Sequence, residues 1–122
     1  MGKRILIVDD SSFARSMLNE ILLKHGYEVV GEARDGNEAL EKYEQLKPDL
    51  VTMDIAMPHL NGINALKKIT DSFPDAKIVM ISSVHSKEIV KSVLLGGALD
   101  YVIKPFTKER LLKAIDKALL QG

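Results

Sequence analysis

The chain has 122 residues, enough for one domain with a buried core but too few for two comfortable ones. Its 17 basic and 17 acidic residues cancel, so no overall field attracts nucleic acid or an anionic membrane, and any charge-based function must be local. The sequence contains no cysteine, which excludes disulfides and thiolate metal sites, and a reducing cytoplasmic location is the simplest expectation.

The first predicted element is a short apolar run that ends at two carboxylates. Residues 5–8 read ILIV, and Asp9 and Asp10 follow directly. Four apolar residues are too few for a signal peptide or a membrane span. Two adjacent anions repel each other unless a cation or water weakens their fields, so the pair needs an explanation.

Strand-length apolar runs and helical segments alternate along the rest of the chain. The five runs cover residues 5–8, 28–33, 50–53, 77–81 and 99–103. Apolar residues recur at helical spacing between and after them, namely at Phe13, Met17, Leu18, Ile21 and Leu22, at Ala39, Tyr43 and Leu46, at Ile63, Leu66, Ile69 and Phe73, and at Leu111, Leu112, Ile115 and Leu119. The order is a strand followed by a helix, five times.

Helix-ending and turn residues agree with this order. Gly26 follows His25 where a helix C-cap belongs, Pro48 stops the second helix, and Asn61-Gly62 turns the chain before the third. The alternation predicts an α/β fold, in which helices cover both faces of a doubly wound, five-stranded parallel sheet. We expect a single domain over residues 1–122, whose last helix ends at Gly122 and leaves no room for an output domain.

Polar residues end four of the five predicted strands. Asp9 and Asp10 follow the first, Asp54 the third, Ser82 and Ser83 the fourth, and Lys104 the fifth. Because ligands of open α/β sheets bind beyond the carboxyl ends of the strands, we expect these side chains to form one site.

The residue types at this edge favour phosphoryl transfer. Three carboxylates cannot converge cheaply without a cation, and Mg²⁺ suits them because it binds a few carboxylates while keeping exchangeable waters. Lys104 would neutralise further charge, and the Ser82 hydroxyl could bind an incoming oxygen. Asp54 stands alone on its strand and is the natural nucleophile, giving an acyl phosphate.

Three motifs carry a resemblance to a known family. The segments VDDSSFAR, DIAMPHLNG and GALDYVIKPF resemble the receiver domain of two-component response regulators, and the resemblance covers essentially the whole chain. It implies the flavodoxin-like, CheY-like fold with strand order 2-1-3-4-5, and a phosphoacceptor that regulates a partner rather than an enzyme.

The resemblance also implies roles at the metal site. Asp54 matches the phosphoacceptor, Asp10 the main carboxylate on Mg²⁺, and Asp9 a carboxylate that acts through metal-bound water. The backbone carbonyl of Ala56 would complete the metal shell.

Two residues match the family's phosphoryl contacts, and one matches its switch. Ser82 and Lys104 correspond to the hydroxyl and lysine that contact the phosphoryl group, and Tyr101 to the switching aromatic, although Tyr101 could serve for packing alone. The resemblance further implies a cis peptide between Lys104 and Pro105.

The segment DDSSFAR resembles the start of chemotaxis receivers. This implies phosphorylation by a CheA-like histidine kinase, a motility or motor-switch protein as partner, and a monomer that binds neither nucleic acid nor membrane. Leu95 and Leu99 flank the sequence GGA, and we expect them to form an apolar partner surface beside Tyr101.

Other interpretations remain open at this point. Asp9 or Asp10 alone could cap the first helix, and His25, His59 and His85 are typical surface or cap residues. A non-chemotaxis receiver such as a phosphorelay intermediate is one alternative function. A Mg²⁺-dependent phosphohydrolase would need a substrate-binding cap, and a flavodoxin-like nucleotide or flavin binder would not place two carboxylates at its phosphate loop.

Overall fold

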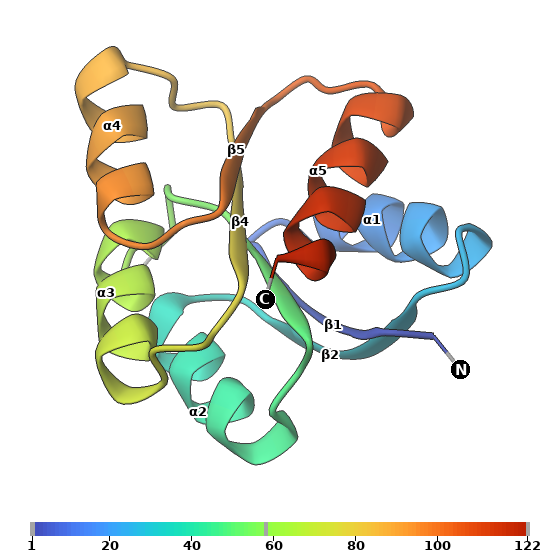
Figure 1. Cartoon of the computed structure of the whole chain (residues 1–122), viewed down its shortest axis with the longest axis horizontal. Helices are drawn as coiled ribbons and strands as arrows, with labels where there is room; N and C mark the ends of the chain where they lie inside the picture. The colour runs from blue at the N-terminus through green and yellow to red at the C-terminus, as the bar shows by residue number, and fades with distance from the viewer. Residues whose placement is uncertain (1, 58, 122) are drawn as a thin grey trace.

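The computed structural model describes residues 2–57 and 59–121, which alternate between five strands and five helices (Figure 1). Each strand begins and ends within one residue of its predicted run. The elements in chain order are β1 (Arg4–Val8), α1 (Ser12–Lys24), β2 (Glu28–Ala33), α2 (Gly36–Leu46), β3 (Leu50–Met53), α3 (Gly62–Ser72), β4 (Ile78–Ser82), α4 (Lys87–Leu95), β5 (Asp100–Ile103) and α5 (Lys108–Leu120).

The strands form one parallel sheet in the order β2-β1-β3-β4-β5, as the resemblance implied. At the carboxyl end of β1, Val8 lies between Ala33 of β2 and Met53 of β3. Met53 in turn pairs with Met80 of β4. The residues that follow β1 and β3 are therefore direct neighbours at one edge of the sheet.

Helices cover both faces of the sheet, so the molecule has three layers (Figure 1). One apolar cluster joins the sheet to α2, α3 and α4, and a second joins it to α1 and α5. Residues 5–8 of β1 are all buried because alternate side chains enter the two clusters. This explains why the strands read as continuous apolar runs.

Helix α1 buries only part of the apolar face that its helical spacing indicated. Its buried residues are Ala14, Leu18 and Leu22, whereas the side chains of Phe13 and Met17 are 77% and 40% exposed. Both stripes have helical spacing, and the stripe that contains the small Ala14 is the one that packs against the sheet. The helical spacing of Phe13 and Met17 therefore indicated the helix but not the side of it that packs against the sheet.

The helix boundaries follow the predicted signals. The Ser11 side chain caps α1 by accepting from the Ala14 amide, so neither aspartate of the pair is used as the cap. Asn61 caps α3 in the same way. At the other end of the chain, α5 ends at Leu120, and the predicted end at Gly122 lies outside the described residues.

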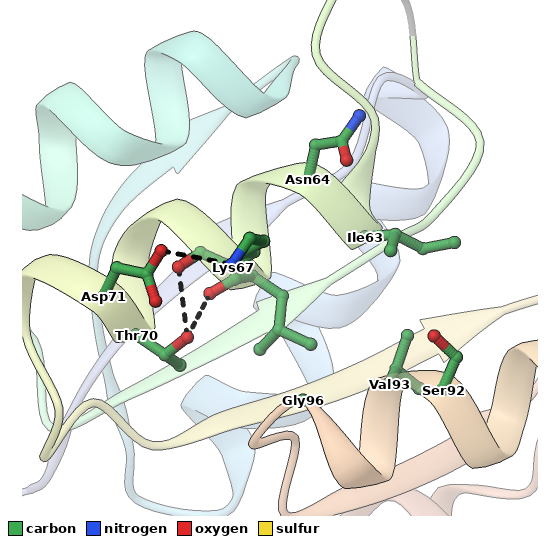
Figure 2. Close-up of a pocket in the computed structure, with 9 residues that line it drawn as sticks. Ile63, Asn64, Lys67, Thr70, Asp71, Ser92, Val93 and Gly96 are labelled. Carbon is green, nitrogen blue, oxygen red and sulfur yellow. Dashed lines mark hydrogen bonds and ion pairs between the residues drawn. The ribbon is translucent and has the colours of Figure 1, made fainter.

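A groove of about 210 Å³ separates α3 from α4 on one face of the molecule (Figure 2). Lys67 and Asp71 of α3 form an exposed ion pair on one wall, and Ser92, Val93 and Gly96 belong to the other. No helix within residues 2–57 and 59–121 has the length and apolarity needed to cross a membrane.

Candidate functional site: an acidic cluster at the carboxyl edge of the sheet

The acidic residues are held by hydrogen bonds that continue the sheet beyond its strands. The Asp9 amide donates to the Ala33 carbonyl at 3.0 Å, and the Asp54 amide donates to the Val8 carbonyl at 3.0 Å. Asp9 and Asp54 are 2% and 8% exposed, while Asp10 is exposed to solvent. Two of the three carboxylates are therefore fixed and largely desolvated.

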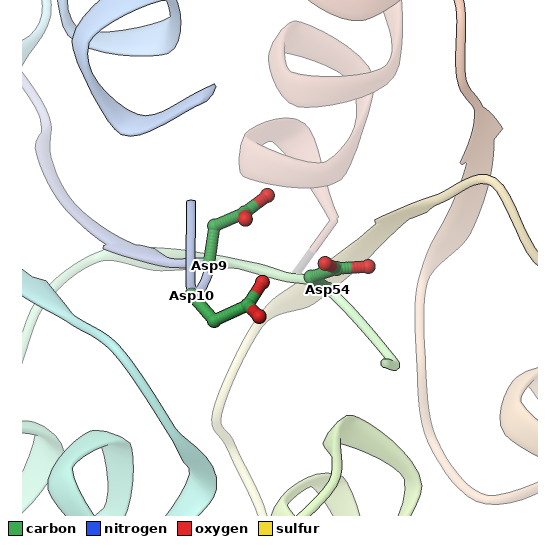
Figure 3. Close-up of side chains that lie close together, drawn as sticks. All are labelled: Asp9, Asp10 and Asp54. Atoms are coloured by element: carbon green, nitrogen blue, oxygen red, sulfur yellow. The ribbon is translucent and has the colours of Figure 1, made fainter. Parts of the chain in front are cut away.

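The three carboxylates share one space at this edge (Figure 3). One carboxylate oxygen from each of Asp9, Asp10 and Asp54 lies within 4.8 Å of the others. Oxygen donors from a few carboxylates, one of them open to water, are the set that Mg²⁺ prefers. The cluster fits that ion, and Ala56, the predicted carbonyl ligand, is exposed in the loop that follows Asp54.

Lys104 supplies a positive charge to the same cluster. Its Nζ lies 2.7 Å from Asp9 Oδ2 and 3.8 Å from Asp54 Oδ2. The lysine follows β5, and its amide donates to the Ser82 carbonyl at 3.0 Å. The Lys104-Pro105 peptide is cis, which confirms that prediction. One ammonium offsets part of the repulsion among three carboxylates and leaves a net negative site.

The environment of Asp54 opposes its ionisation. Burial raises the pKa of the Asp54 carboxyl, the nearby Lys104 ammonium lowers it, and the charge of Asp9 raises it again. The Ile55 amide, which donates to Asp54 Oδ1 at 2.7 Å, and the Ser82 hydroxyl also favour the ionised form. The net direction is upward, so an additional cation would relieve a carboxylate that the fold has desolvated.

Ser82 and Tyr101 meet at the backbone of one residue. Ser82 is fully buried at the end of β4, and its Oγ accepts from the Val84 amide at 3.2 Å. Tyr101 is 7% exposed, and its hydroxyl donates to the Val84 carbonyl. The segment between β4 and α4 is thus tied both to the acidic edge and to β5.

The predicted partner surface is not brought together. Leu95 is 78% exposed at the end of α4. Leu99 is half-buried and packs with the α1 and α5 cluster, whereas Tyr101 belongs to the cluster on the opposite face of the sheet. Leu95, Leu99 and Tyr101 therefore do not form one apolar patch.

Sequence reasoning missed a charged residue beside the acidic cluster. Arg15 of α1 donates from Nη1 to the Asp9 carbonyl at 2.7 Å and from Nε to Glu32 Oε1 at 2.9 Å. Arg15 was visible within DDSSFAR, but its role was not, because Glu32 becomes its neighbour only through the pairing of β1 with β2.

A glycine next to the site was also missed. A Cβ on Gly62 would lie 1.9 Å from the Asp54 carbonyl oxygen, so only glycine allows α3 to begin where it does. The Asn61-Gly62 pair indicated a turn, whereas the close approach to Asp54 depends on tertiary structure.

A hollow of about 470 Å³ lies beside the acidic cluster, between α1 and the loop that follows β5. Its lining is mostly apolar and includes Phe13, Met17, Ile21, Pro105 and Phe106. Lys104 lines this hollow and also contacts Asp9. The exposed stripe of α1 is therefore continuous with the acidic cluster.

A doubly wound parallel sheet with an acidic cluster and a lysine at its carboxyl edge defines a receiver. The chain belongs to the response regulator receiver domain family, whose model matches residues 5–116. It is 51% identical to the chemotaxis protein CheY of Thermotoga maritima over 96% of this chain and 98% of that one. Identity to CheY of Bacillus subtilis is 49%, over 98% and 99% of the two chains.

Solved structures agree with the sequence comparison. The chain is similar to a chain from the CheX-CheY-BeF3-Mg²⁺ complex of Borrelia burgdorferi, with a TM-score of 0.95, 33% identity, and coverage of 98% of this chain and 90% of that one. The chain is also similar to the response regulator domain of Thermotoga maritima CheB, with a TM-score of 0.93, 39% identity, and coverage of 100% of this chain and 99% of that one. The protein is a CheY-like response regulator, a regulatory switch rather than an enzyme.

Proposed function

We propose that Asp54 accepts a phosphoryl group from the phosphohistidine of a CheA-like histidine kinase, and that the phosphorylated form controls a motility or motor-switch protein. The observation that carries this proposal is the convergence of Asp9, Asp10, Asp54 and the Lys104 ammonium at one edge of the sheet. The CheY relatives support the assignment to chemotaxis. The proposal places the protein in the cytoplasm as a monomer.

The chemical step needs positioning more than covalent assistance. Asp54 Oδ1 accepts from the Ile55 amide, so Oδ2, which faces Lys104, is the oxygen that attacks phosphorus. An O–P bond forms as the P–N bond to the imidazole breaks. The electron pair stays on the imidazole nitrogen, and the product is an acyl phosphate. Lys104 and the Ser82 hydroxyl neutralise and bind the phosphoryl oxygens.

The residues that would hold Mg²⁺ are Asp9, Asp10, Asp54 and the carbonyl of Ala56. When bound, the ion supplies charge neutralisation and orientation for the phosphoryl oxygens. The assignment is supported by the oxygen-only donor set and by the raised pKa of Asp54. It is also in keeping with the Mg²⁺ named in the Borrelia burgdorferi complex.

The signal leaves the site through Ser82 and Tyr101. A phosphoryl group adds about −1.5 to −2 charge and three acceptor oxygens. The Ser82 hydroxyl can donate to one of them while its oxygen still accepts from the Val84 amide, so movement of Ser82 toward the phosphoryl group displaces the segment that also receives the Tyr101 hydroxyl. The surface of α4, β5 and α5 then changes. To move the ratio of active to inactive conformation from 1:99 to 99:1, the phosphoryl group must favour the active conformation by about 5.5 kcal/mol. Several charge-assisted hydrogen bonds can supply this free energy.

The hollow beside α1 is the docking surface for the phosphodonor domain in this proposal. A donor must bring its phosphohistidine to Asp54, and the hollow is the apolar surface that shares Lys104 with the acidic cluster. Met17→Lys should slow phosphorylation by the kinase about tenfold, since it places a charge in an apolar contact. The rate with acetyl phosphate should stay the same; equal slowing with both donors would contradict the docking assignment.

The test of the phosphoacceptor uses phosphoramidate, a small donor that has the same P–N bond as phosphohistidine. We expect an intact-mass gain of one phosphoryl group that requires Mg²⁺ and disappears in Asp54→Asn. Asp49→Asn is the matched control, because Asp49 precedes the same strand and binds the Arg4 amide at the opposite edge of the sheet. A gain that persists in Asp54→Asn, or none in the wild-type protein, would refute the proposal.

The chemotaxis assignment has its own test. Beryllofluoride-activated protein should bind a motor-switch protein at least about tenfold more tightly than the unactivated protein, as expected for a coupling of 1–3 kcal/mol. Rapid transfer of the phosphoryl group to a histidine phosphotransfer domain, without motor-switch binding, would favour a phosphorelay intermediate instead.

A further inference from the structure

We propose that Arg15 is a positioning residue for the Mg²⁺ site, an inference that rests on the proposed function. Its guanidinium joins three parts of the molecule, since it belongs to α1, donates to the Asp9 carbonyl at the end of β1, and binds the Glu32 side chain of β2. The Arg15 side chain is only 14% exposed, so these contacts are not a loose surface pairing.

The contact at the Asp9 carbonyl determines where the acidic pair points. Three hydrogen bonds hold Asp9. Its backbone amide donates to the Ala33 carbonyl, its Oδ1 accepts from the Ser11 amide, and its Oδ2 accepts from the Lys104 ammonium. Its carbonyl belongs to the peptide that leads to Asp10, and Arg15 fixes the orientation of that peptide. The Asp10 carboxylate is exposed, so its direction depends mainly on the backbone that carries it.

A planar guanidinium can make both contacts at once because its N–H groups form a fixed fork. A lysine in the same place could donate to the carbonyl or to Glu32, but it could not hold both in one geometry. Partners that orient metal ligands commonly affect metal affinity about 10- to 100-fold when they are removed. The effect should therefore depend on the shape of the Arg15 side chain and not only on its charge.

Charge and geometry predict opposite results, which makes the proposal testable. If Arg15 acted only as a positive charge beside the acidic cluster, Arg15→Gln would bind Mg²⁺ more tightly and Arg15→Lys would bind it unchanged. If Arg15 positions the carboxylates, both variants bind Mg²⁺ about tenfold more weakly. Arg4→Gln is the matched control, since Arg4 donates to the Lys47 carbonyl at the opposite edge of the sheet.

The experiment measures the Mg²⁺ dissociation constant by isothermal titration calorimetry, at a fixed ionic strength and well below the unfolding temperature of each variant. We expect about tenfold weakening in Arg15→Lys and Arg15→Gln, and less than twofold change in Arg4→Gln. A lower unfolding temperature with unchanged Mg²⁺ affinity would reduce Arg15 to a structural role and overturn the proposal. Tighter binding in Arg15→Gln would overturn it as well.

Glu32→Ala provides an independent test if a change at Arg15 prevents folding. The Glu32 side chain is 40% exposed, so its removal leaves no buried cavity, yet it releases one half of the Arg15 contacts. We expect Glu32→Ala to bind Mg²⁺ about threefold more weakly than Glu32→Gln, which loses the same charge but keeps an oxygen that accepts from Arg15. Equal affinity of these two variants would contradict the proposal. Failure of the wild-type protein to bind Mg²⁺ would instead refute the metal site itself.

Discussion

Helices α4 and α5 both lie beside β5, on opposite faces of the sheet, but they are held very differently (Figure 1). Helix α5 buries Leu111, Ala114, Ile115 and Ala118. In the described part of α4, Val93 alone is fully buried, and a groove separates this helix from α3 (Figure 2). The fold thus anchors one helix of the proposed output surface and leaves the other free to respond.

Polar contacts also hold α5 more firmly than α4. At the start of α5, Arg110 makes a bidentate contact with Asp100 at 3.1 and 3.3 Å, and near its end Asp116 accepts from Tyr27. Helix α4 is preceded by the segment that Ser82 and Tyr101 hold at Val84. Elements that move in switching come from the less stable part of a fold, so α4 is the element that we expect to respond to phosphorylation.

The largest expected effect is on core stability. Ile115→Ala should lower the free energy of unfolding by about 3.5 kcal/mol, because it leaves a cavity in a fully buried site. Val93→Ala should cost about 1.5 kcal/mol, since two carbons are lost rather than three and the neighbouring groove allows α4 to relax. Urea unfolding monitored by circular dichroism measures both. Similar losses in the two variants would contradict the difference in anchoring.

Hydrogen exchange gives the second test, on the wild-type protein. Amides of α4 should exchange about 100-fold faster than the protected amides of α5, which corresponds to a difference of about 3 kcal/mol in opening free energy. Mass spectrometry of peptides from residues 87–95 and 108–120 provides the measurement. Equal protection of the two helices would show that α4 opens only when the whole domain unfolds.

Removal of the Tyr101 hydroxyl should have a smaller effect, confined to the region around α4. Tyr101→Phe removes the hydrogen bond to the Val84 carbonyl and should cost about 1 kcal/mol. Because that bond holds the segment before α4, exchange should accelerate in α4 while the rates in α5 stay unchanged. Tyr43→Phe is a control, since Tyr43 lies in the same apolar cluster but at its α2 end. Acceleration in both helices would refute a local tether.

The elements of this fold could be predicted because each one has a local signal. Residues 50–53 form a buried run before Asp54, and Gly26 and Pro48 end their helices through their own backbone chemistry. The convergence of Asp9, Asp54 and Lys104 also followed from the sequence, because the carboxyl ends of parallel strands meet at one edge of a sheet.

Contacts that depend on three dimensions were beyond the sequence. The two apolar stripes of α1 have the same period, and only the packing shows that Leu18 is buried while Phe13 is exposed. Leu99 and Tyr101 are two residues apart, yet they belong to opposite faces of the sheet. Arg15 meets Glu32 only because β1 pairs with β2.

The hydrogen bond from the Tyr27 hydroxyl to Asp116 provides the last test of how α5 is held. Burial raises the pKa of the Tyr27 hydroxyl, and its hydrogen bond to Asp116 and the charge of that carboxylate raise it further. The folded protein therefore favours the neutral phenol. The neutral Tyr27 hydroxyl therefore contributes fully to the free energy of unfolding below about pH 10, the usual pKa of tyrosine. This contribution is lost as the pH rises toward the higher pKa that Tyr27 has in the folded state.

Tyr27→Phe should accordingly cost about 0.5 kcal/mol at pH 7, a modest value because the side chain is half-exposed. Urea unfolding between pH 7 and about pH 11 should show the wild-type advantage shrinking above about pH 10. Exchange should quicken only in the last turns of α5, near Asp116, because Leu111 and Ile115 still hold the rest of the helix. If it quickened throughout α5, the tyrosine rather than the buried face would be the main anchor of this helix.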